Sequence, residues 1–534
     1  MNHSNKDENV CCAILLQPPP GDLTGPYPAL PYLKSYAEFH GHTVKVRDLA
    51  IEALYFLAQE DKIRCLFDRV ASMRKELEFK RFLSPVEQVH YRLLVTAAWL
   101  GSKPDFTAKA MASFKDHRQF YNYRLYKQSC RVLDAFYGAL SAVYHPTILT
   151  PSEYPTAQTL NSMDKVLAHR HHDTNPYSEY YQKVLFSEIA AQAPKVIGIS
   201  MEFASQSVQA LVLGHLIKER FPRIHVTMGG AYLSQWIMLM GDEQLSKLFA
   251  CTDSVICGEG ETAFSQLLDR IEAGLPLSGV SNLMFRNPFT GEFLRTNALE
   301  YPDIETLPPP DYSDLDLNAY LIPKQVIPYC ISRGCYWGKC VFCQNRYGEN
   351  HMRRYQTVSV EKAITEMSLM FEQYGSNHFN FSNDVLDPSY LMRLSEALIG
   401  SRKRFLWNTD LRAEKAFTRD LCQTMARAGL NSVAIGFESA CQNTLDAMNK
   451  GKKIETVIQV VKDLYSAGVA TQAMGFFGFP GETEADAEAT VRFLEENVGT
   501  LSYYVIGLLM VVPGSRMHEE PQKYGVSSIS YDGN

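Results

Sequence analysis

In this 534-residue chain, three cysteines in one short segment have the spacing that most clearly indicates a metal site. Cys335, Cys340 and Cys343 lie in the sequence GCYWGKCVFC, which has C-x4-C-x2-C spacing. Three thiolates in one tight loop can hold three irons of a [4Fe–4S] cluster and leave the fourth iron open. A zinc site with Cys330 as fourth ligand is the alternative, since structural zinc prefers a closed tetrahedral set. We favour the cluster, because Cys330 is expected to lie inside a strand with its side chain fixed by packing.

The composition excludes several other classes of protein. The chain is 46% hydrophobic and 21% charged, as in ordinary globular proteins, and not as in disordered chains, collagens or small disulfide scaffolds. Its net charge of −7 counts against a general nucleic-acid binder. The sequence contains no stretch of 18 apolar residues, so no membrane span is expected. The apolar run 10–16 is too short for a signal peptide. We therefore expect a cytoplasmic protein, in which clustered cysteines favour metal binding over disulfides.

The first half of the chain predicts a parallel, doubly wound sheet, because short apolar segments alternate with helical patterns over residues 1–275. The expected strands are 12–16, 44–46, 196–200, 224–228 and 254–257. Between the second and third strands lies a helical insertion of about residues 50–190. Its apolar residues recur at i, i+3, i+4 and i+7, and Ser84-Pro85-Val86-Glu87 is a capping box. This insertion is expected to form a subdomain over one face or edge of the sheet.

The second half predicts a partial (β/α)6 barrel over residues 326–534, joined to the first half by a linker over 276–325. The expected strands are 326–332, 378–382, 404–409, 432–437, 469–476 and 502–511. In parallel barrels the active residues lie at the carboxyl ends of the strands. The sequence stops soon after the sixth expected strand, so the barrel could lack a C-terminal element.

Further motifs follow the barrel strands in order. The segment FSND ends the second strand, Arg412 follows the third, GFES ends the fourth, and GFPGET follows the fifth. Together with the cysteine loop, these motifs resemble those of the radical SAM superfamily over about residues 325–515. The usual cysteine spacing in that family is C-x3-C-x2-C, one residue shorter than here.

This resemblance implies a fold, a metal site and a binding site for S-adenosyl-L-methionine (SAM). It makes Cys335, Cys340 and Cys343 the cluster ligands. It places Phe342 against the adenine and implies that the remaining SAM contacts come from Asn383, Asp384, Arg412, Glu438, Gly478 and Pro480. Simpler roles exist for several of these residues: Asp384 could cap a helix, and Arg412 could be part of an ion pair. Glu438 needs a partner in any case, because an unpaired buried carboxylate is costly.

The N-terminal sheet resembles the Rossmann-like cobalamin-binding domain that precedes the barrel in one large radical SAM subfamily. Glycine-rich strand ends in such a sheet allow a flat macrocycle to approach the backbone. The resemblance assigns to cobalamin residues at four successive strand ends: Pro19; Ser200, Met201, Glu202 and Ser205; Gly229, Gly230, Ala231 and Tyr232; and Gly258, Glu259 and Gly260. The sequence has no D-x-H-x-x-G motif, so we expect no protein histidine on cobalt.

The resemblance implies a cobalamin-dependent radical SAM C-methyltransferase. In that family the reduced cluster cleaves SAM to a 5′-deoxyadenosyl radical, and methylcobalamin then methylates the substrate radical. The cofactors supply the difficult chemistry and the protein positions them. We expect a peptide or other natural-product substrate, an electron donor such as flavodoxin or ferredoxin, and neither nucleic acid nor membrane as partner. The alternatives are a ring-contraction or cyclisation enzyme of the same architecture, a radical enzyme without cobalamin, and a corrinoid carrier or sensor.

We expect structural roles, and no direct part in chemistry, for two further groups of residues. His169, His171 and His172 lie in a polar stretch and are expected in a solvated loop rather than at a metal. The tyrosines of the insertion are spaced as helix faces and are expected in its core or at an interface: Tyr121, Tyr123, Tyr126 and Tyr137.

Overall fold

The chain consists of two compact units, which we describe separately. The computed structural model describes residues 12–98, 105–154, 163–171, 173–287, 289–296, 301–344 and 355–530. The first unit comprises Met1–Glu300, Pro310–Gln325 and Tyr531–Asn534, and the second comprises Tyr301–Pro309 and Val326–Ser530. Among the described residues, none of the helices combines the length and apolar character needed to span a bilayer.

A seven-stranded sheet forms the centre of the first unit, with strand order β2-β1-β3-β4-β5-β6-β7. The five expected strands are all present and parallel: β1 (Ala13–Gln17), β2 (Val44–Asp48), β3 (Val196–Ser200), β4 (His225–Gly229) and β5 (Ser254–Ile256). The predicted doubly wound architecture is confirmed. The segment 276–325 is more than the expected linker, since β6 (Leu283–Arg286) and β7 (Phe293–Arg295) extend the sheet antiparallel to β5. Strands this short carry too little alternation to be recognised in the sequence.

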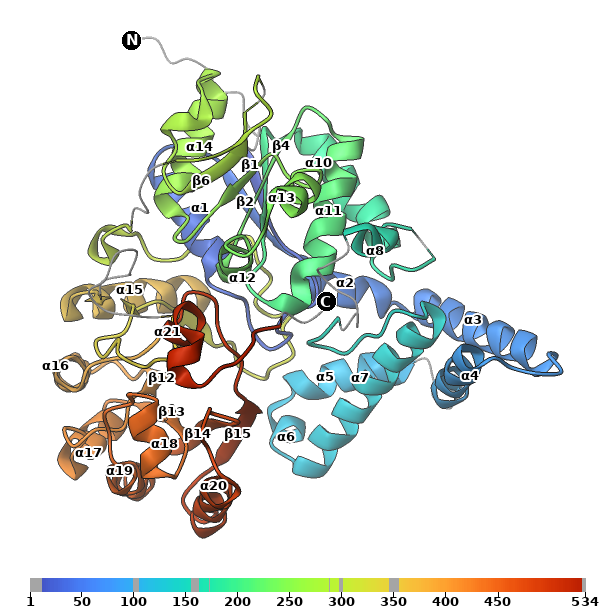
Figure 1. The fold of residues 1–534 in the computed structure, drawn as a ribbon. Helices are drawn as coiled ribbons and strands as arrows, with labels where there is room; N and C mark the ends of the chain where they lie inside the picture. The colour runs from blue at the N-terminus through green and yellow to red at the C-terminus, as the bar shows by residue number, and fades with distance from the viewer. Residues whose placement is uncertain are drawn as a thin grey trace. The chain divides into compact units, whose positions relative to one another are not determined.

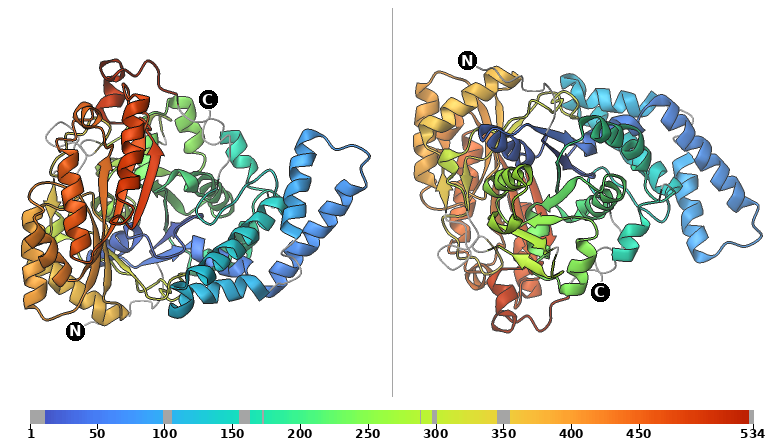
Figure 2. Two further views of the ribbon diagram at one scale, coloured as in Figure 1. Left: turned by 90° about the horizontal axis from the view of Figure 1, so that it is seen from below. Right: turned by 90° about the horizontal axis from the view of Figure 1, so that it is seen from above.

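Helices cover both faces of this sheet (Figures 1 and 2). Alternate residues of β1 point to opposite faces, as the two-residue period of a strand requires. Ile14 and Leu16 join one core with α11 (Ser207–Arg220), while Ala13 and Leu15 join another with α1 (Ala29–Phe39) and α14 (Glu261–Ala273). Two short helices follow β4, α12 (Ala231–Trp236) and α13 (Asp242–Leu248).

The predicted insertion is helical throughout its ordered elements. It contains α2 (Leu49–Leu57), α3 (Glu60–Glu78), α4 (Pro85–Ala98), α5 (Asp105–Lys115), α6 (His117–Phe120), α7 (Tyr123–Val143), α8 (Met163–Ala168), α9 (Ser178–Tyr180) and α10 (Phe186–Gln192). Glu87 Oε2 accepts from Ser84 N at 2.8 Å, as the capping box predicts. Tyr137 is buried in a core that is continuous with the sheet. The expectation was wrong for Tyr121 and Tyr123, which are 70% and 74% exposed.

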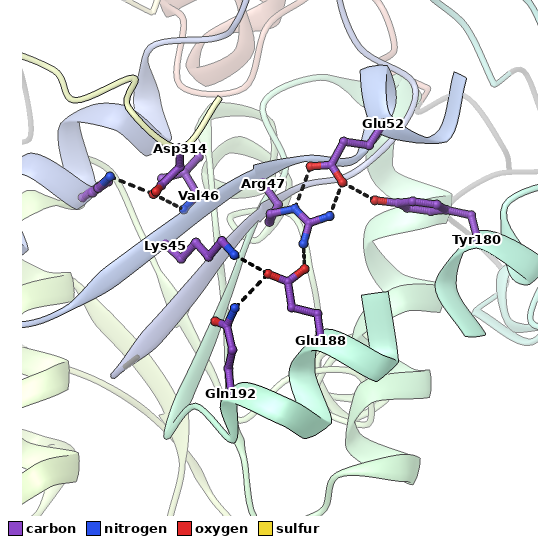
Figure 3. A network of polar contacts seen from close by, with 9 residues as sticks. Lys45, Val46, Arg47, Glu52, Tyr180, Glu188, Gln192 and Asp314 are labelled. Atoms are coloured by element: carbon purple, nitrogen blue, oxygen red, sulfur yellow. Dashed lines mark hydrogen bonds and ion pairs between the residues drawn. The ribbon is translucent and has the colours of Figure 1, made fainter. Parts of the chain in front are cut away.

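A polar network fastens the insertion to the edge strand β2 (Figure 3). Arg47 of β2 forms ion pairs with Glu52 of α2 and Glu188 of α10. Tyr180 donates to Glu52 at 2.5 Å, and Lys45 reaches Glu188 at 2.5 Å. Because the two carboxylates share one half-buried guanidinium, the network joins the beginning and the end of the insertion to the same strand.

The second unit is an open parallel barrel of six strands in the order β15-β14-β13-β12-β11-β8. Its strands match the six that the sequence predicts: β8 (Ile327–Tyr329), β11 (His378–Phe381), β12 (Leu406–Leu411), β13 (Leu430–Glu438), β14 (Ala470–Phe477) and β15 (Tyr503–Leu508). The connecting helices are α15 (Val360–Tyr374), α16 (Pro388–Gly400), α17 (Arg419–Arg427), α18 (Gln442–Ala447), α19 (Ile454–Ser466) and α20 (Glu484–Glu496), and α21 (Arg516–Glu519) follows β15. Because the strands are parallel, the βα repeat brings the carboxyl ends of all six to the same side of the barrel.

Candidate functional site

The cysteine loop of the second unit follows β8 and is closed at its base by a small sheet. Strand β9 (Ser332–Arg333) pairs antiparallel with β10 (Gln356–Thr357), which holds the two ends of the loop together. The sequence predicted that Cys330 lies inside the strand, and this was wrong, because β8 ends at Tyr329 and Cys330 directly follows it. Its thiol donates to the carbonyl oxygen of Ser332 at 3.4 Å. The assignment of the cluster to the other three cysteines therefore rests on their shared loop and not on the strand position of Cys330.

The turn after α18 anchors this loop. Val341 N donates to Met448 O at 3.0 Å, and the Trp337 indole donates to Asn449 O at 3.0 Å. Asn449 returns a hydrogen bond from Nδ2 to Lys339 O, also at 3.0 Å. Gly451 has φ +64°, and a Cβ atom there would lie 2.0 Å from the Trp337 ring. Trp337 can therefore approach the turn only because residue 451 is glycine.

Two cationic side chains, Arg412 and Lys450, lie beside aromatic rings of the loop. The Arg412 guanidinium is centred 4.1 Å from the Trp337 ring, forms an ion pair with Glu414 and donates to Lys450 O. Lys450 forms an ion pair with Glu438, and its ammonium lies 5.5 Å from the centre of the Phe342 ring. The partner that buried Glu438 requires is thus Lys450. Arg412 has the ion pair that its simpler role implies, and it also supports the loop.

Burial and nearby positive charge shift the pKa of the Cys340 thiol in opposite directions. Burial raises the pKa of the Cys340 thiol, while the nearby positive charges of Lys450 and Arg412 oppose that shift. Burial also lowers the pKa of Lys452 well below its usual value, and the charge of Lys450 lowers it further. Cys335, Cys340 and Cys343 are half-buried thiols in no disulfide, as a cluster site requires. The residues present fit a [4Fe–4S] cluster held by three thiolates beside a cationic patch.

A second polar group lies at the ends of β11 and β12. Asn383 Oδ1 accepts from Thr409 Oγ1 at 3.1 Å, while Asn383 Nδ2 is buried with no hydrogen-bond partner among the described residues. Asp410 on β12 has its pKa raised to about 6, first by burial and then by the negative charge of Asp384. Asp384 does not cap the next helix, because Asp387 does so by accepting from Tyr390 N at 2.9 Å. An unpartnered amide donor beside two carboxylates fits the amino-acid end of a ligand such as SAM.

The segment after β14 forms a turn of its own. Gly478 N donates to Glu482 Oε2 at 2.6 Å, and both Gly478 and Gly481 have positive φ. A Cβ atom at Gly481 would have no neighbour within 4 Å, so backbone shape alone explains that glycine. Phe479, which lies between Gly478 and Pro480, packs in one apolar cluster with Val341 of the cysteine loop. The expected contacts of Gly478 and Pro480 with SAM stay a prediction.

At the carboxyl edge of the first unit's sheet, the loops after β3 and β4 are tied together. Glu202 accepts from Ser200 Oγ at 2.6 Å and from Ala231 N at 3.1 Å. Met201 N donates to Gly229 O at 2.7 Å. Gly230 has φ +108°, and a Cβ atom there would lie 2.4 Å from Met201 O. Glycine is therefore required at residue 230 for this close approach of two backbones.

The other predicted loops belong to the same edge. Gln206 is fully buried, accepts from Glu202 N at 2.9 Å and donates to Pro18 O at 3.3 Å, so it joins the loop before Pro19 to the loop that carries Ser205. Gly258 N donates to Ser234 Oγ at 3.0 Å, and Glu259 O accepts from Asn282 Nδ2 at 3.0 Å. Gly260 precedes α14, and Tyr232 stacks on Trp236. These glycine-lined loops fit a flat macrocycle, and their sequences contain no histidine to bind its metal.

Comparisons with known proteins agree with this geometry. Residues 329–494 match the radical SAM superfamily. This stretch of the second unit is a radical SAM domain. It is 26% identical over 362 residues to an uncharacterised methyltransferase of Pyrococcus horikoshii, which covers 65% of this chain and 74% of that protein. It is 29% identical to a bacteriochlorophyllide d C-12(1)-methyltransferase of Chlorobaculum tepidum, over 51% of this chain and 55% of that protein.

The fold is similar to that of solved cobalamin-dependent radical SAM enzymes. The structure of TsrM, a radical SAM methyltransferase from Kitasatospora setae, with tryptophan and a SAM analogue bound, matches 97% of this chain with a TM-score of 0.60. That match covers 77% of TsrM at 13% identity. TsrM has also been solved with cobalamin and a [4Fe–4S] cluster bound, and that structure matches with a TM-score of 0.54. At this identity the similarity concerns the fold.

The histidines of the insertion have separate surroundings. His169 is half-buried, and its Nδ1 lies 3.2 Å from both Thr147 Oγ1 and Tyr154 OH, so it is not the solvated residue that the sequence suggested. His171 is exposed as expected, and His172 lies outside the described residues.

Sequence reasoning missed several residues of the site. Lys450 and Lys452 lie in the segment NKGKK between two helices, a composition typical of a solvated turn. Asp410 lies inside the strand sequence LWNTDL, where no periodic signal separates a functional carboxylate from an ordinary one. Gln206 is the last residue of the predicted polar loop 200–206 after β3, but no pattern in the sequence assigned it a contact.

Proposed function

We propose that this chain is a cobalamin-dependent radical SAM methyltransferase that transfers a methyl group to an unactivated carbon of a small natural product or a peptide. The observation that carries the proposal is the combination, in one chain, of a three-cysteine loop and a parallel sheet edged by glycine loops. The cofactors supply radical formation and methyl transfer when bound. The relatives named as methyltransferases support this reaction class.

In this proposal the residues of the second unit hold the cluster and SAM. Cys335, Cys340 and Cys343 bind iron, and Phe342 lies against the adenine. Asn383 Nδ2, which has no partner among the described residues, donates to the amino-acid part of SAM, and Asp384 accepts from its ammonium group. Lys450 holds Glu438 and Phe342 in place. The remaining predicted contacts, Arg412, Gly478 and Pro480, complete the site.

The loops at the carboxyl edge of the first unit's sheet would hold cobalamin. Ser200, Glu202 and Gly230 form the centre of this edge, where the hydrogen bonds of Glu202 fix the spacing of two loops. No histidine lies in these loops, so the lower face of cobalt receives no histidine nitrogen from them. Electron paramagnetic resonance of the Co(II) form tests this when the protein is labelled with 15N-histidine, since nitrogen splitting that changes on labelling would contradict it.

An electron donor such as flavodoxin or ferredoxin would reduce the cluster.

The helical insertion would form part of the lining of the substrate site. The described residues of the insertion form nine α-helices and one π-helix, which exceeds what a βα crossover needs. Hydrogen exchange of the holoenzyme should then show added protection in α5 and α7 when a substrate is present. Unchanged exchange there would limit the insertion to a structural role.

The reaction class is tested with SAM that carries a trideuterated methyl group. The anaerobically reconstituted enzyme, a low-potential reductant and candidate substrates such as tryptophan-containing peptides and tetrapyrroles are incubated together. We expect a product with a trideuteromethyl group on carbon, together with 5′-deoxyadenosine and S-adenosylhomocysteine in equal amounts. Formation of 5′-deoxyadenosine with a rearranged product that lacks the label would contradict methyl transfer and support the cyclisation alternative.

A further inference from the structure

A cysteine, a histidine and two carboxylates gather at the edge of the first unit's sheet that lies opposite the glycine loops. Cys12 directly precedes β1, and His42 lies in the turn between α1 and β2. Glu272 and Asp269 belong to the last turns of α14, which packs beside α1 in the same core. These residues come from the amino-terminal ends of parallel strands, whereas the glycine loops follow the carboxyl ends.

Three of these side chains have the spacing of a metal site. Cys12 Sγ lies 3.0 Å from Glu272 Oε1, and His42 Nδ1 lies 3.6 Å from Glu272 Oε2. The three ligand atoms all lie within 4.8 Å of one another. With zinc–ligand bonds of about 2.0–2.3 Å, tetrahedral ligands are roughly 3.3–3.8 Å apart. The cluster therefore needs only small side-chain adjustments to surround one ion.

The fourth residue, Asp269, faces the other ring nitrogen of His42. His42 is 8% exposed, and its Nε2 is buried with no hydrogen bond among the described residues. The Asp269 carboxylate is 3.3 Å from Nε2. A histidine that binds a metal through one nitrogen commonly directs the other N–H to a carboxylate, which fixes the tautomer and the ring orientation. This arrangement assigns Nδ1 to the metal and Nε2 to Asp269.

The backbone around the cluster is held before any ion binds. Cys12 N donates to Thr43 O at 2.8 Å, next to His42, and His42 N donates to Ala37 O at 3.1 Å. Lys195 N and Val196 N both donate to Cys12 O, at 3.0 and 3.2 Å. A site on such fixed backbone loses little conformational entropy when it binds a ligand.

We propose that Cys12, His42 and Glu272 form a zinc site on the first unit, separate from the cysteine loop and from the glycine loops. Thiolate, imidazole and carboxylate together suit zinc, whereas calcium and magnesium prefer oxygen ligands alone. Glu272 is the most exposed of the three, so water can take the fourth position from its side. The ion would connect the start of β1, the turn before β2 and the end of α14.

The test is zinc analysis and zinc K-edge X-ray absorption of the full-length reconstituted enzyme. Iron and cobalt do not contribute at this edge, so the result stands whether or not the proposed function is correct. We expect about one zinc per chain with one sulfur and two to three nitrogen or oxygen neighbours. Zinc that vanishes in the Cys335→Ala variant but persists in Cys12→Ala would place the ion in the cysteine loop and overturn the proposal.

Matched variants separate binding from folding. Cys12→Ala and Glu272→Gln should abolish stoichiometric zinc, whereas Cys65→Ala, at an exposed cysteine of the same unit, should retain it. Asp269→Asn should weaken zinc affinity by roughly 10- to 100-fold without removing the ligands. Unchanged zinc affinity in folded Glu272→Gln, verified by circular dichroism, would show that Glu272 is not a ligand and would overturn the proposed site.

Discussion

The cysteine loop of the second unit and the glycine loops of the first are held in place in different ways. The cysteine loop is held by side chains from distant segments: Trp337 contacts Arg412 and Asn449, and Phe342 lies near Lys450. The glycine loops are held by hydrogen bonds between neighbouring strand ends, from the Glu202 and Gln206 side chains and from Met201 N to Gly229 O, which Gly230 permits. The first arrangement places positive charge beside three thiols, and the second brings glycine-rich backbone together at one edge of the sheet.

The largest expected effect concerns the cluster ligands. Replacing Cys340 with Ala removes one of three thiolates, and we expect iron content and SAM cleavage to fall to background. Cys330→Ala is the control, since Cys330 lies before the loop and should keep both. Anaerobic iron analysis and 5′-deoxyadenosine formation measure the difference. Loss of the cluster in Cys330→Ala would overturn the three-ligand assignment and revive a zinc site or a four-thiolate site.

Lys450→Met tests whether side-chain charge holds the cysteine loop. It leaves the Glu438 carboxylate buried without its cation, which costs about 3–5 kcal/mol for buried pairs. The neighbouring Lys453→Met changes an exposed lysine and is the matched control. Urea unfolding of the two variants should therefore differ by several kcal/mol, and equal midpoints would show that the ion pair is not essential.

Gly230→Ala tests the backbone arrangement of the first unit. The new Cβ would meet Met201 O, and the positive φ adds strain of about 1–3 kcal/mol. Gly274→Ala also has positive φ in the same unit, but its Cβ would have no neighbour within 4 Å. Cobalamin retention should fall in Gly230→Ala and persist in Gly274→Ala. Full retention in both would mean that the loops tolerate displacement.

The smallest expected effect is the pH dependence of Asp410. Its folded pKa of about 6 lies above the ordinary value of 3.8, so ionisation disfavours folding. That penalty is fully present above pH 6 and disappears as the pH falls below 4. Asp410→Asn should therefore stabilise the apoprotein by about 1 kcal/mol at pH 7, allowing for partial solvent screening, and by almost nothing at pH 4. A stabilisation independent of pH would contradict the assigned burial.

The strands and the position of the cysteine loop after the first barrel strand could be predicted from sequence, because apolar runs and glycine turns are local signals. Eleven strands were expected and found in this way, while β6, β7, β9 and β10 were not recognised because each spans only two to four residues. The support beneath the cysteine loop was also missed. Lys452 is buried and Lys450 half-buried in a turn that packs against Trp337, which lies more than a hundred residues earlier in the chain, and no local pattern reports that contact.

The central claim is that one chain holds two independent cofactor sites, one for a [4Fe–4S] cluster and one for cobalamin. Iron and cobalamin content, measured in parallel on the wild-type protein, Cys335→Ala and Gly230→Ala, tests this claim directly. We predict about four irons and one cobalamin for the wild type. Cys335→Ala should lose iron and keep cobalamin, and Gly230→Ala should lose cobalamin and keep iron. Cobalamin that is absent from the wild type, or lost together with iron in Cys335→Ala, would contradict the account.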